Sequence, residues 1–343
     1  MDELRYSRQI LFAGIGREGQ SKLASSRVAI VGMGALGTVL ANHMARAGVG
    51  YLRLIDRDFV EASNLQRQML YDEQDAAQST AKAQAAANKL RAVNSQIVMD
   101  PHVVDVNATN AESLLADVDL ILDGSDNFAV RFLLNDVAVK HSIPWIYGGA
   151  VRSRGTVLAI RPGETPCLRC LFGNVPEAGT IETCDTAGVI APIIDIVASY
   201  QATFALKLLT GQASQLPARM LQFDPWELQY SAVDVSRMKK ADCPACAQRQ
   251  FDFLDYHAAE DTVQTLCGRD SVQIQPLQAH TLDLREWAER WRPLGELTAN
   301  PFLLKCKLPS GQTMVLFPDG RLLVQGTDDP VFAKTCYSRY IGL

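Results

Sequence analysis

The 343-residue sequence predicts an α/β fold, with a Rossmann-like, doubly wound and mostly parallel sheet, an antiparallel extension, and a small C-terminal α+β domain. Two observations predict the parallel part. Short apolar runs alternate with helix-like segments up to about residue 147, and the first of these runs stops at a glycine-rich turn. Beyond Gly149 hairpin-like segments replace this alternation, which predicts the antiparallel extension.

The expected elements of the first part follow from hydrophobic periodicity and from turn and capping residues. Strands are expected at residues 27–33, 51–56, 97–104, 118–123, 144–147, 155–161, 220–223 and 228–235. Helices are expected at 35–47, at 79–93 with Ser79 as the cap, at 127–141 and at 191–209. The last helix is apolar but contains Pro192, Asp195, Gln201 and Lys207, which favours a buried helix of a soluble protein over a membrane span.

The C-terminal part has its own pattern. Residues 251–266 are polar and aperiodic, and after them we expect strands at 271–275, 302–308, 313–317 and 321–325, with helices at 282–291 and 329–340. A Pro-Asp-Gly turn at 318–320 predicts a tight hairpin. The sequence therefore predicts a first domain over residues 1–250, a linker over 251–262 and a small domain of unknown role over 263–343.

Composition narrows the classes of function. The formal net charge is −5 and no Lys/Arg cluster occurs, so we expect no nucleic-acid partner. The N-terminus carries acids early and leads into no apolar signal segment, so we expect a cytoplasmic protein that does not enter a membrane.

A glycine-rich loop is the first candidate binding motif. Gly32, Gly34 and Gly37 form G-x-G-x-x-G after a strand and at the start of a helix, where backbone N–H groups can receive a phosphate. Asp56 ends the next strand, where its carboxylate can accept from ribose hydroxyls. The loop and Asp56 predict an adenine nucleotide, and taken alone they also fit an NAD-dependent oxidoreductase.

Polar residues downstream of Asp56 favour chemistry on a triphosphate. A site that breaks a triphosphate needs cations near its phosphates, and Arg67 and Lys82 can supply them. Asp126 follows a predicted parallel strand at the edge where ligands bind, and it can hold Mg²⁺ there. Asp123 is the second choice, because it can instead cap the next helix or close an Asx-turn.

These motifs resemble the ThiF/MoeB family, the bacterial relatives of ubiquitin-activating enzymes. The resemblance also covers Arg5-Tyr-Ser-Arg-Gln9, two Cys pairs and residues 184–189, and it extends over roughly residues 1–250. It implies ATP-dependent adenylation of the C-terminal Gly-Gly carboxylate of a ThiS-like or MoaD-like sulfur carrier, in thiamine or molybdopterin biosynthesis. A sulfur-donor protein would then attack the adenylate.

The same resemblance implies a homodimer and assigns the site residues. Arg8 of one protomer would complete the ATP site of the other. The implied catalytic residues are Arg8, Asn64, Arg67, Lys82, Asp126 and Cys184. The implied nucleotide-binding residues are Gly32, Gly34, Gly37, Asp56, Asp58, Asn64, Arg67, Gln68, Lys82, Asp126 and Asn127.

The cysteines separate into two groups. Cys167-x-x-Cys170 and Cys243-x-x-Cys246 have the form of two zinc knuckles, which predicts a structural zinc clip with four cysteine ligands, with a redox role as the competing interpretation. Cys184 is unpaired and lies in a long loop; a covalent role and a buried free cysteine both remain open. Three further cysteines have no ligand spacing and are interpreted as packing residues: Cys267, Cys306 and Cys336.

Simpler interpretations remain for several polar residues. From the sequence alone, Arg5 and Arg8 can be solvated surface charges. Arg131 and Asn135 can be plain surface positions on their helix. A non-catalytic scaffold that binds the carrier is a third alternative for the whole protein.

Overall fold

The computed structural model describes residues 3–175, 182, 184–255, 262–266, 270–276 and 280–342. The chain divides into two compact units, Met1–Tyr256 and His257–Leu343, which we call the first and the second unit. Each is described by itself.

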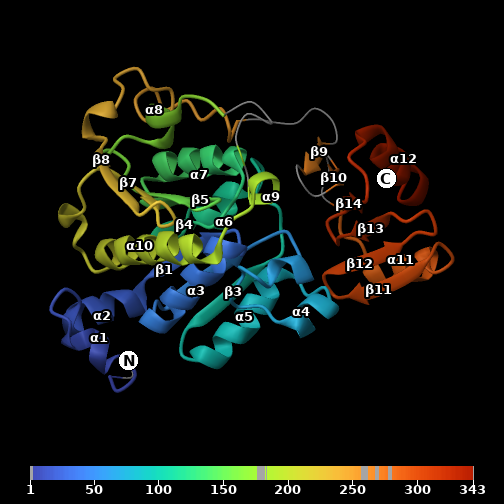
Figure 1. Ribbon diagram of the computed structural model, residues 1–343, viewed down its shortest axis with the longest axis horizontal. Helices are drawn as coiled ribbons and strands as arrows, with labels where there is room; N and C mark the ends of the chain where they lie inside the picture. Colours follow the sequence, from blue (N-terminus) through green and yellow to red (C-terminus); the bar gives the residue numbers. More distant parts are fainter. Residues whose placement is uncertain are drawn as a thin grey trace. The chain divides into compact units, whose positions relative to one another are not determined.

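The first unit is built on an eight-stranded sheet with the order β3-β2-β1-β4-β5-β6-β7-β8 (Figure 1). Neighbouring strands among β1 to β5 pair in parallel, and β6, β7 and β8 each pair antiparallel. The strands are Arg27–Val31 (β1), Tyr51–Ile55 (β2), Val98–His102 (β3), Leu120–Asp123 (β4), Trp145–Val151 (β5), Arg154–Ile160 (β6), Arg219–Asp224 (β7) and Gln229–Asp234 (β8). The expected doubly wound sheet with an antiparallel extension is confirmed.

Helices cover both faces of this sheet (Figure 1). They are Ser7–Leu11 (α1), Gly16–Ser25 (α2), Ala35–Ala47 (α3), Glu73–Ala77 (α4), Lys82–Val93 (α5), Ala111–Leu115 (α6), Phe128–His141 (α7), Leu168–Phe172 (α8), Cys184–Ala187 (α9) and Ala191–Leu209 (α10). Short 3₁₀ turns lie at Ala62–Asn64, Ala213–Gln215 and Ser236–Met238.

The period of two along each strand decides which side chains enter which core. Val28 and Ile30 of β1 pack with α3, α5 and α10, whereas Ala29 and Val31 pack with α6 and α7. Both faces are therefore apolar, as expected for a parallel sheet that is covered on both sides.

The order of the strands creates a switch point between β1 and β4. The chain leaves β1 toward β2 and β3 on one side and continues through β4 and β5 on the other. In register, Val31 of β1 lies beside both Ile55 of β2 and Asp123 of β4. The loops that follow these three strands therefore meet at one edge, where ligands bind in open α/β sheets.

Helix α10 lies on the sheet against α3, β5 and β6. By length and composition it is the one helix among the described residues that could span a membrane, a test that the core helix of a soluble protein also passes. Its Gln201 is fully buried and donates from Nε2 to the carbonyl oxygen of Asp123 at 2.8 Å. This hydrogen bond fixes the last residue of β4 against α10.

The second unit contains a six-stranded antiparallel sheet with the order β11-β12-β13-β14-β10-β9 and two helices. Its elements are Thr262–Leu266 (β9), Ser271–Gln275 (β10), Glu296–Asn300 (β11), Leu303–Lys307 (β12), Thr313–Leu316 (β13), Leu322–Gln325 (β14), Leu284–Trp291 (α11) and Pro330–Tyr340 (α12). Asp283 and Asp329 cap the two helices with their side chains. Trp287 and Trp291 join alternate strand residues in the core.

Two expectations about the elements were wrong, and several helices and strands had no predicted counterpart: α1, α2, α4, α6, α8, α9 and β11. Strand β9 lies inside the stretch interpreted as aperiodic, and β11 had no predicted counterpart; both are polar strands whose pairing comes from their neighbours. Ser79 does not cap α5. Ser79 has φ +46°, outside the helical region, and Ala81, two residues later, forms a β-bridge with Phe59. The helix therefore begins only at Lys82.

Candidate functional site

The glycine loop connects β1 to α3, and two of its glycines are required by close backbone contacts. Gly32 has φ +89°, and a Cβ there would lie 2.7 Å from the Gly124 carbonyl group. A Cβ on Gly37 would lie 1.8 Å from the Gly32 oxygen. A Cβ on Gly34 would meet only Gln68 Nε2, at 3.9 Å, so the side of the loop at Gly34 is open to a ligand.

Asp56 fixes the loop from the end of β2. Its Oδ2 accepts from the Met33 N–H at 2.6 Å, and its Oδ1 accepts from the Asp58 N–H at 2.7 Å. Burial is the largest influence on this carboxyl and raises its pKa, while nearby Lys82 acts in the opposite direction. The sequence placed Asp56 at this edge correctly.

Lys82 is the first residue of α5, and only 3% of its surface is exposed. Its Nζ lies 3.5 Å from Oδ2 of Asp58, and its N–H donates to the Asp58 carbonyl oxygen at 2.9 Å. A cation at the positive end of a helix dipole gains nothing from that dipole. The Lys82 ammonium group thus lies near the carboxylates of Asp58 and Asp56, beside the glycine loop, and the helix dipole does not stabilise it there.

The segment that follows Asp58 carries three further candidates. Asn64 is buried in a 3₁₀ turn, where its Oδ1 accepts from the Glu61 N–H. Arg67 is half-buried and donates to the Ser63 carbonyl oxygen at 2.9 Å. Gln68 is buried, and its Oε1 has no hydrogen-bond partner among the described residues. A buried amide oxygen without a partner is costly in the ligand-free protein, which makes a ligand contact at Gln68 chemically sensible.

The loop after β4 brings Asp123 and Asp126 to the same edge. Asp123 is fully buried, and its Oδ1 accepts from Ser125 N and Oγ, which is the Asx-turn considered from the sequence. Asp126 is exposed. Asn127 caps α7 by accepting from the Ala129 N–H at 2.8 Å.

The surface interpretation of Arg131 and Asn135 was wrong. Arg131 is 5% exposed and its Nε donates to Asp123 Oδ2 at 2.9 Å. It also donates to the carbonyl oxygens of Ser125 and Gly148. Asn135 is fully buried and accepts from the Leu168 N–H, because α7 is enclosed between the sheet and the α8 segment.

Sequence reasoning missed Arg57 and Tyr71. Burial lowers the pKa of the Arg57 guanidinium, and four acids raise it, among them Asp56, Asp58 and Asp126. The acids together outweigh burial, so the pKa of Arg57 lies above its ordinary value. Its position directly after Asp56 was the available signal. Tyr71 is buried and donates to the Met33 carbonyl oxygen at 2.7 Å; nothing in the sequence pattern marks it.

One predicted residue, Arg8, is not brought to the loop. Arg8 is exposed on α1, and its neighbour Gln9 donates to the Ala47 carbonyl oxygen at the far end of α3 from the loop. Cys184 begins α9, but its side chain lies outside the described residues, as does Cys267. Cys306 and Cys336 are buried in the core of the second unit.

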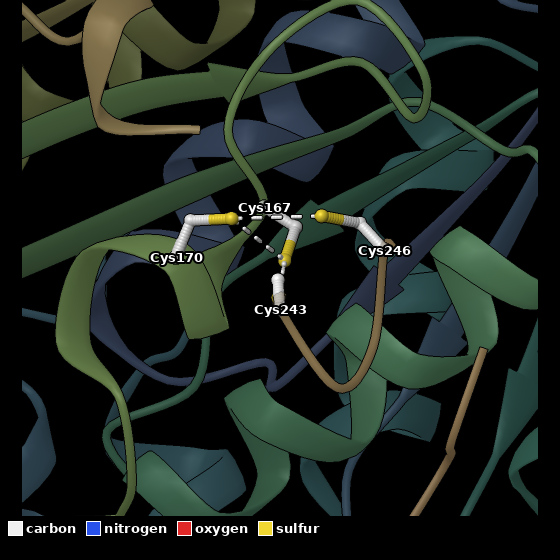
Figure 2. A group of neighbouring side chains, drawn as sticks. All are labelled: Cys167, Cys170, Cys243 and Cys246. Atoms are coloured by element: carbon white, nitrogen blue, oxygen red, sulfur yellow. Dashed lines mark hydrogen bonds between the residues drawn. The ribbon is translucent and has the colours of Figure 1, made fainter. Parts of the chain in front are cut away.

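The two Cys-x-x-Cys pairs converge, as Figure 2 shows. Cys167 Sγ lies 3.9 Å from Cys170 Sγ and 3.6 Å from Cys243 Sγ, and Cys170 Sγ lies 3.5 Å from Cys246 Sγ. Tetrahedral zinc with Zn–S bonds of about 2.3 Å requires S···S separations of about 3.8 Å.

The donor set also fits zinc chemically. Three of the four cysteines are fully buried, and all four are free thiols. Burial raises the pKa of the Cys167 thiol, and a bound metal ion would deprotonate it. Four converging thiols favour a closed metal site over a two-cysteine redox pair. Zinc here would join β6 and α8 to the segment after β8.

Comparison with known proteins agrees with this geometry. The model of the ThiF family matches residues 6–245. The sulfur carrier protein ThiS adenylyltransferase of Bacillus subtilis (strain 168) is 45% identical over 339 residues, which cover 98% of this chain and 99% of that protein. The SAMP-activating enzyme E1 of Haloferax volcanii is 38% identical over 251 residues, which cover 73% of this chain and 91% of that one.

A solved structure supports the fold. The crystal structure of E. coli MccB with ATP aligns at a TM-score of 0.62 and 24% identity, over 71% of this chain and 74% of that one. The match to the B. subtilis protein runs through both units, whereas the family model ends within the first unit.

Proposed function

Because the chain belongs to the ThiF family, we propose that it uses ATP to adenylate the C-terminal carboxylate of a ubiquitin-like sulfur-carrier protein. The observation that carries this proposal is the match over nearly the whole chain to a ThiS adenylyltransferase. The carrier would be ThiS-like or MoaD-like, with a Gly-Gly tail, in thiamine or molybdopterin biosynthesis. A cytoplasmic location follows from that role.

The chemistry is nucleotidyl transfer. An oxygen of the carrier's terminal carboxylate attacks the α-phosphorus of ATP, the bond from that phosphorus to the bridging oxygen breaks, and pyrophosphate leaves. The acyl-adenylate that remains can be attacked by a sulfur-donor protein. This step needs positioned phosphates and neutralised charge rather than a protein nucleophile.

The glycine loop and Asp56 would bind the nucleotide. The open side of the loop at Gly34 would receive phosphate oxygens on backbone N–H groups at the start of α3. Asp56 would hold the ribose. The pairing of Lys82 with Asp58 at 3.5 Å supports a role for this lysine, because a triphosphate would replace that carboxylate as its counter-ion.

The remaining site residues surround the phosphates in this proposal. Asn64, Arg67 and Gln68 would contact the nucleotide from the segment after Asp58. Asp126 would hold Mg²⁺ from the loop after β4, where carboxylate oxygens are suitable ligands, with Asn127 beside it. Cys184 remains a candidate for a covalent link to the carrier or to a sulfur species.

A homodimer would complete the site with Arg8. Arg8 is exposed and lies at the end of α3 away from the chain's own glycine loop, which supports a role toward a partner's site. Leu4, Leu11 and Phe12 are strongly exposed around it, and apolar exposure of this kind is typical of a surface that is covered in an assembly.

Exchange of labelled pyrophosphate into ATP tests the proposal. Exchange should require a Gly-Gly-terminated carrier and should fall by at least about a hundredfold in Asp126→Ala, as expected when a charge-stabilising group is lost. Glu73→Ala, which removes an exposed carboxylate on α4, is the control and should retain wild-type exchange. A dimer that binds ATP but exchanges pyrophosphate with neither ThiS-like nor MoaD-like carriers would instead fit the scaffold alternative.

A further inference from the structure

Tyr71 connects two segments of the nucleotide site that are far apart in sequence. It lies just before α4, it is 7% exposed, and its ring belongs to the core formed with α3, α5 and α10. Its hydroxyl donates to the Met33 carbonyl oxygen at 2.7 Å and lies 3.1 Å from the Lys82 carbonyl oxygen. The Tyr71 hydroxyl thus contacts the backbone of both the glycine loop and the first residue of α5.

The Met33 peptides are held from both sides. The Met33 N–H donates to Asp56 at 2.6 Å, and the Met33 carbonyl oxygen accepts from Tyr71. The orientation of this carbonyl group also fixes the orientation of the next peptide N–H, that of Gly34, because a peptide unit is planar. Gly34 is the open residue of the loop.

The second contact concerns Lys82. The Lys82 N–H donates to the Asp58 carbonyl oxygen at 2.9 Å, and the Lys82 carbonyl oxygen faces the Tyr71 hydroxyl. A tyrosine hydroxyl is protonated at neutral pH, and burial raises the pKa of Tyr71 further above its ordinary value, so the hydroxyl is a donor. The same hydroxyl therefore fixes the backbone that carries the buried ammonium group.

We propose that Tyr71 is a positioning residue of the nucleotide site, holding the glycine loop and the start of α5 in the one relative geometry that fits a bound phosphate chain. The inference rests on the proposed function, since it assumes that ATP binds at this loop. Tyr71 itself reaches the phosphates only through Met33 and Lys82.

Loss of the hydroxyl should lower the fraction of protein that is competent to bind. The apparent Kd rises in inverse proportion to that fraction. One hydrogen bond contributes on the order of 1 kcal/mol, which corresponds to roughly a fivefold change in an equilibrium constant. Tyr71→Phe should therefore raise the Kd for ATP with Mg²⁺ by up to about fivefold.

Tyr6 provides a matched control. It is also buried, and its hydroxyl accepts from Asn94 Nδ2 at 2.9 Å. It packs at Gly48, beyond the far end of α3, which is about 20 Å from the glycine loop for a helix of this length. Tyr6→Phe removes the same atom from the same unit without touching the chain's own glycine loop.

The experiment compares full-length wild type, Tyr71→Phe and Tyr6→Phe by calorimetric titration with ATP and Mg²⁺ and by hydrogen exchange. Tyr71→Phe should bind more weakly, by up to about fivefold, with unchanged stoichiometry, and peptides covering residues 32–38 and 80–86 should exchange faster. Tyr6→Phe should keep the wild-type Kd. A purely structural role would reduce the stoichiometry and leave Kd unchanged.

Equal Kd values and equal exchange of those peptides in wild type and Tyr71→Phe would overturn this inference alone. Failure of the wild-type protein to bind ATP would overturn the proposed function, and the inference with it.

Discussion

Asp136 of α7 offers a stability prediction with a distinctive pH dependence. Its carboxyl is fully buried, and its Oδ2 accepts from the Phe253 N–H at 3.0 Å. Burial, the largest influence, raises the pKa of Asp136 from 3.8 to about 6, with Asp252 acting in the same direction and Arg169 opposing it. Asp136→Asn keeps the shape and the acceptor for Phe253 but removes the ionisation.

The sign of the effect follows from proton linkage. Because the folded pKa is raised, the native protein binds more protons than the unfolded chain between pH 3.8 and about 6, so wild-type stability falls as pH rises through that window. A shift of about two pKa units corresponds to about 3 kcal/mol. Asp136→Asn escapes this cost. It should be more stable than wild type by up to about 3 kcal/mol above pH 7, and the advantage should shrink toward pH 5.

Unfolding by heat and by urea, measured on both proteins from pH 5 to 8 with equal zinc content, gives the difference directly. Asp255→Asn removes an exposed carboxylate from the same segment, and its difference from wild type should not vary across this range. If Asp136→Asn were no more stable than wild type at pH 8, or if its advantage grew on acidification, the assignment of a costly buried carboxylate would be refuted.

Two further predictions concern the zinc centre and α7. Metal analysis should find one zinc ion per chain. Cys243→Ser should lose this ion and unfold the antiparallel extension, because structural zinc contributes about 10–16 kcal/mol against a domain stability of roughly 5–15 kcal/mol. A Cys243→Ser variant that lacks zinc but keeps the wild-type melting temperature would contradict this prediction. Arg131→Met should cost about 3–5 kcal/mol by leaving the buried Asp123 carboxylate unpaired, and Arg131→Met with Asp123→Asn should recover part of that loss in urea unfolding. No recovery in the double variant would show that Arg131 acts mainly through the backbone carbonyl groups of Ser125 and Gly148.

The part of the site that the sequence predicts well is the part encoded locally. Gly32, Asp56 and Asp123 each follow or end an apolar strand, and parallel strands bring their carboxyl ends to one edge. The cysteine pairs are also encoded locally, because each Cys-x-x-Cys pair supplies half of the ligands of one candidate metal site. Convergence of the two halves needed only that the fold place β6 and β8 in one sheet.

The sequence did not predict which polar side chains are buried when helices pack against other elements. A charged or amide side chain on a helix is usually exposed, so the sequence alone allows Arg131 and Asn135 to be surface residues. Helix α7 is apolar around most of its circumference, however, and such a helix is buried on all sides. Polar residues in it must then find partners, and Asp123 and the Leu168 N–H are those partners. That pattern was the available signal.

The charges at the glycine loop explain why the loop suits a triphosphate better than its sequence motif alone implies. Among the described residues, neither α3 nor α5 has a side chain that caps its first turn, so no capping side chain offsets the positive ends of the two helix dipoles. Tyr71 ties these two helix starts together through Met33 and Lys82. The buried Lys82 ammonium adds a full positive charge at the same place. Asp58 offsets it only at 3.5 Å, a longer separation than a charge-assisted hydrogen bond adopts. A nicotinamide dinucleotide brings one charge on each of two phosphates, whereas ATP brings about four. A ligand of higher negative charge competes better with Asp58 for the Lys82 ammonium group, which favours ATP.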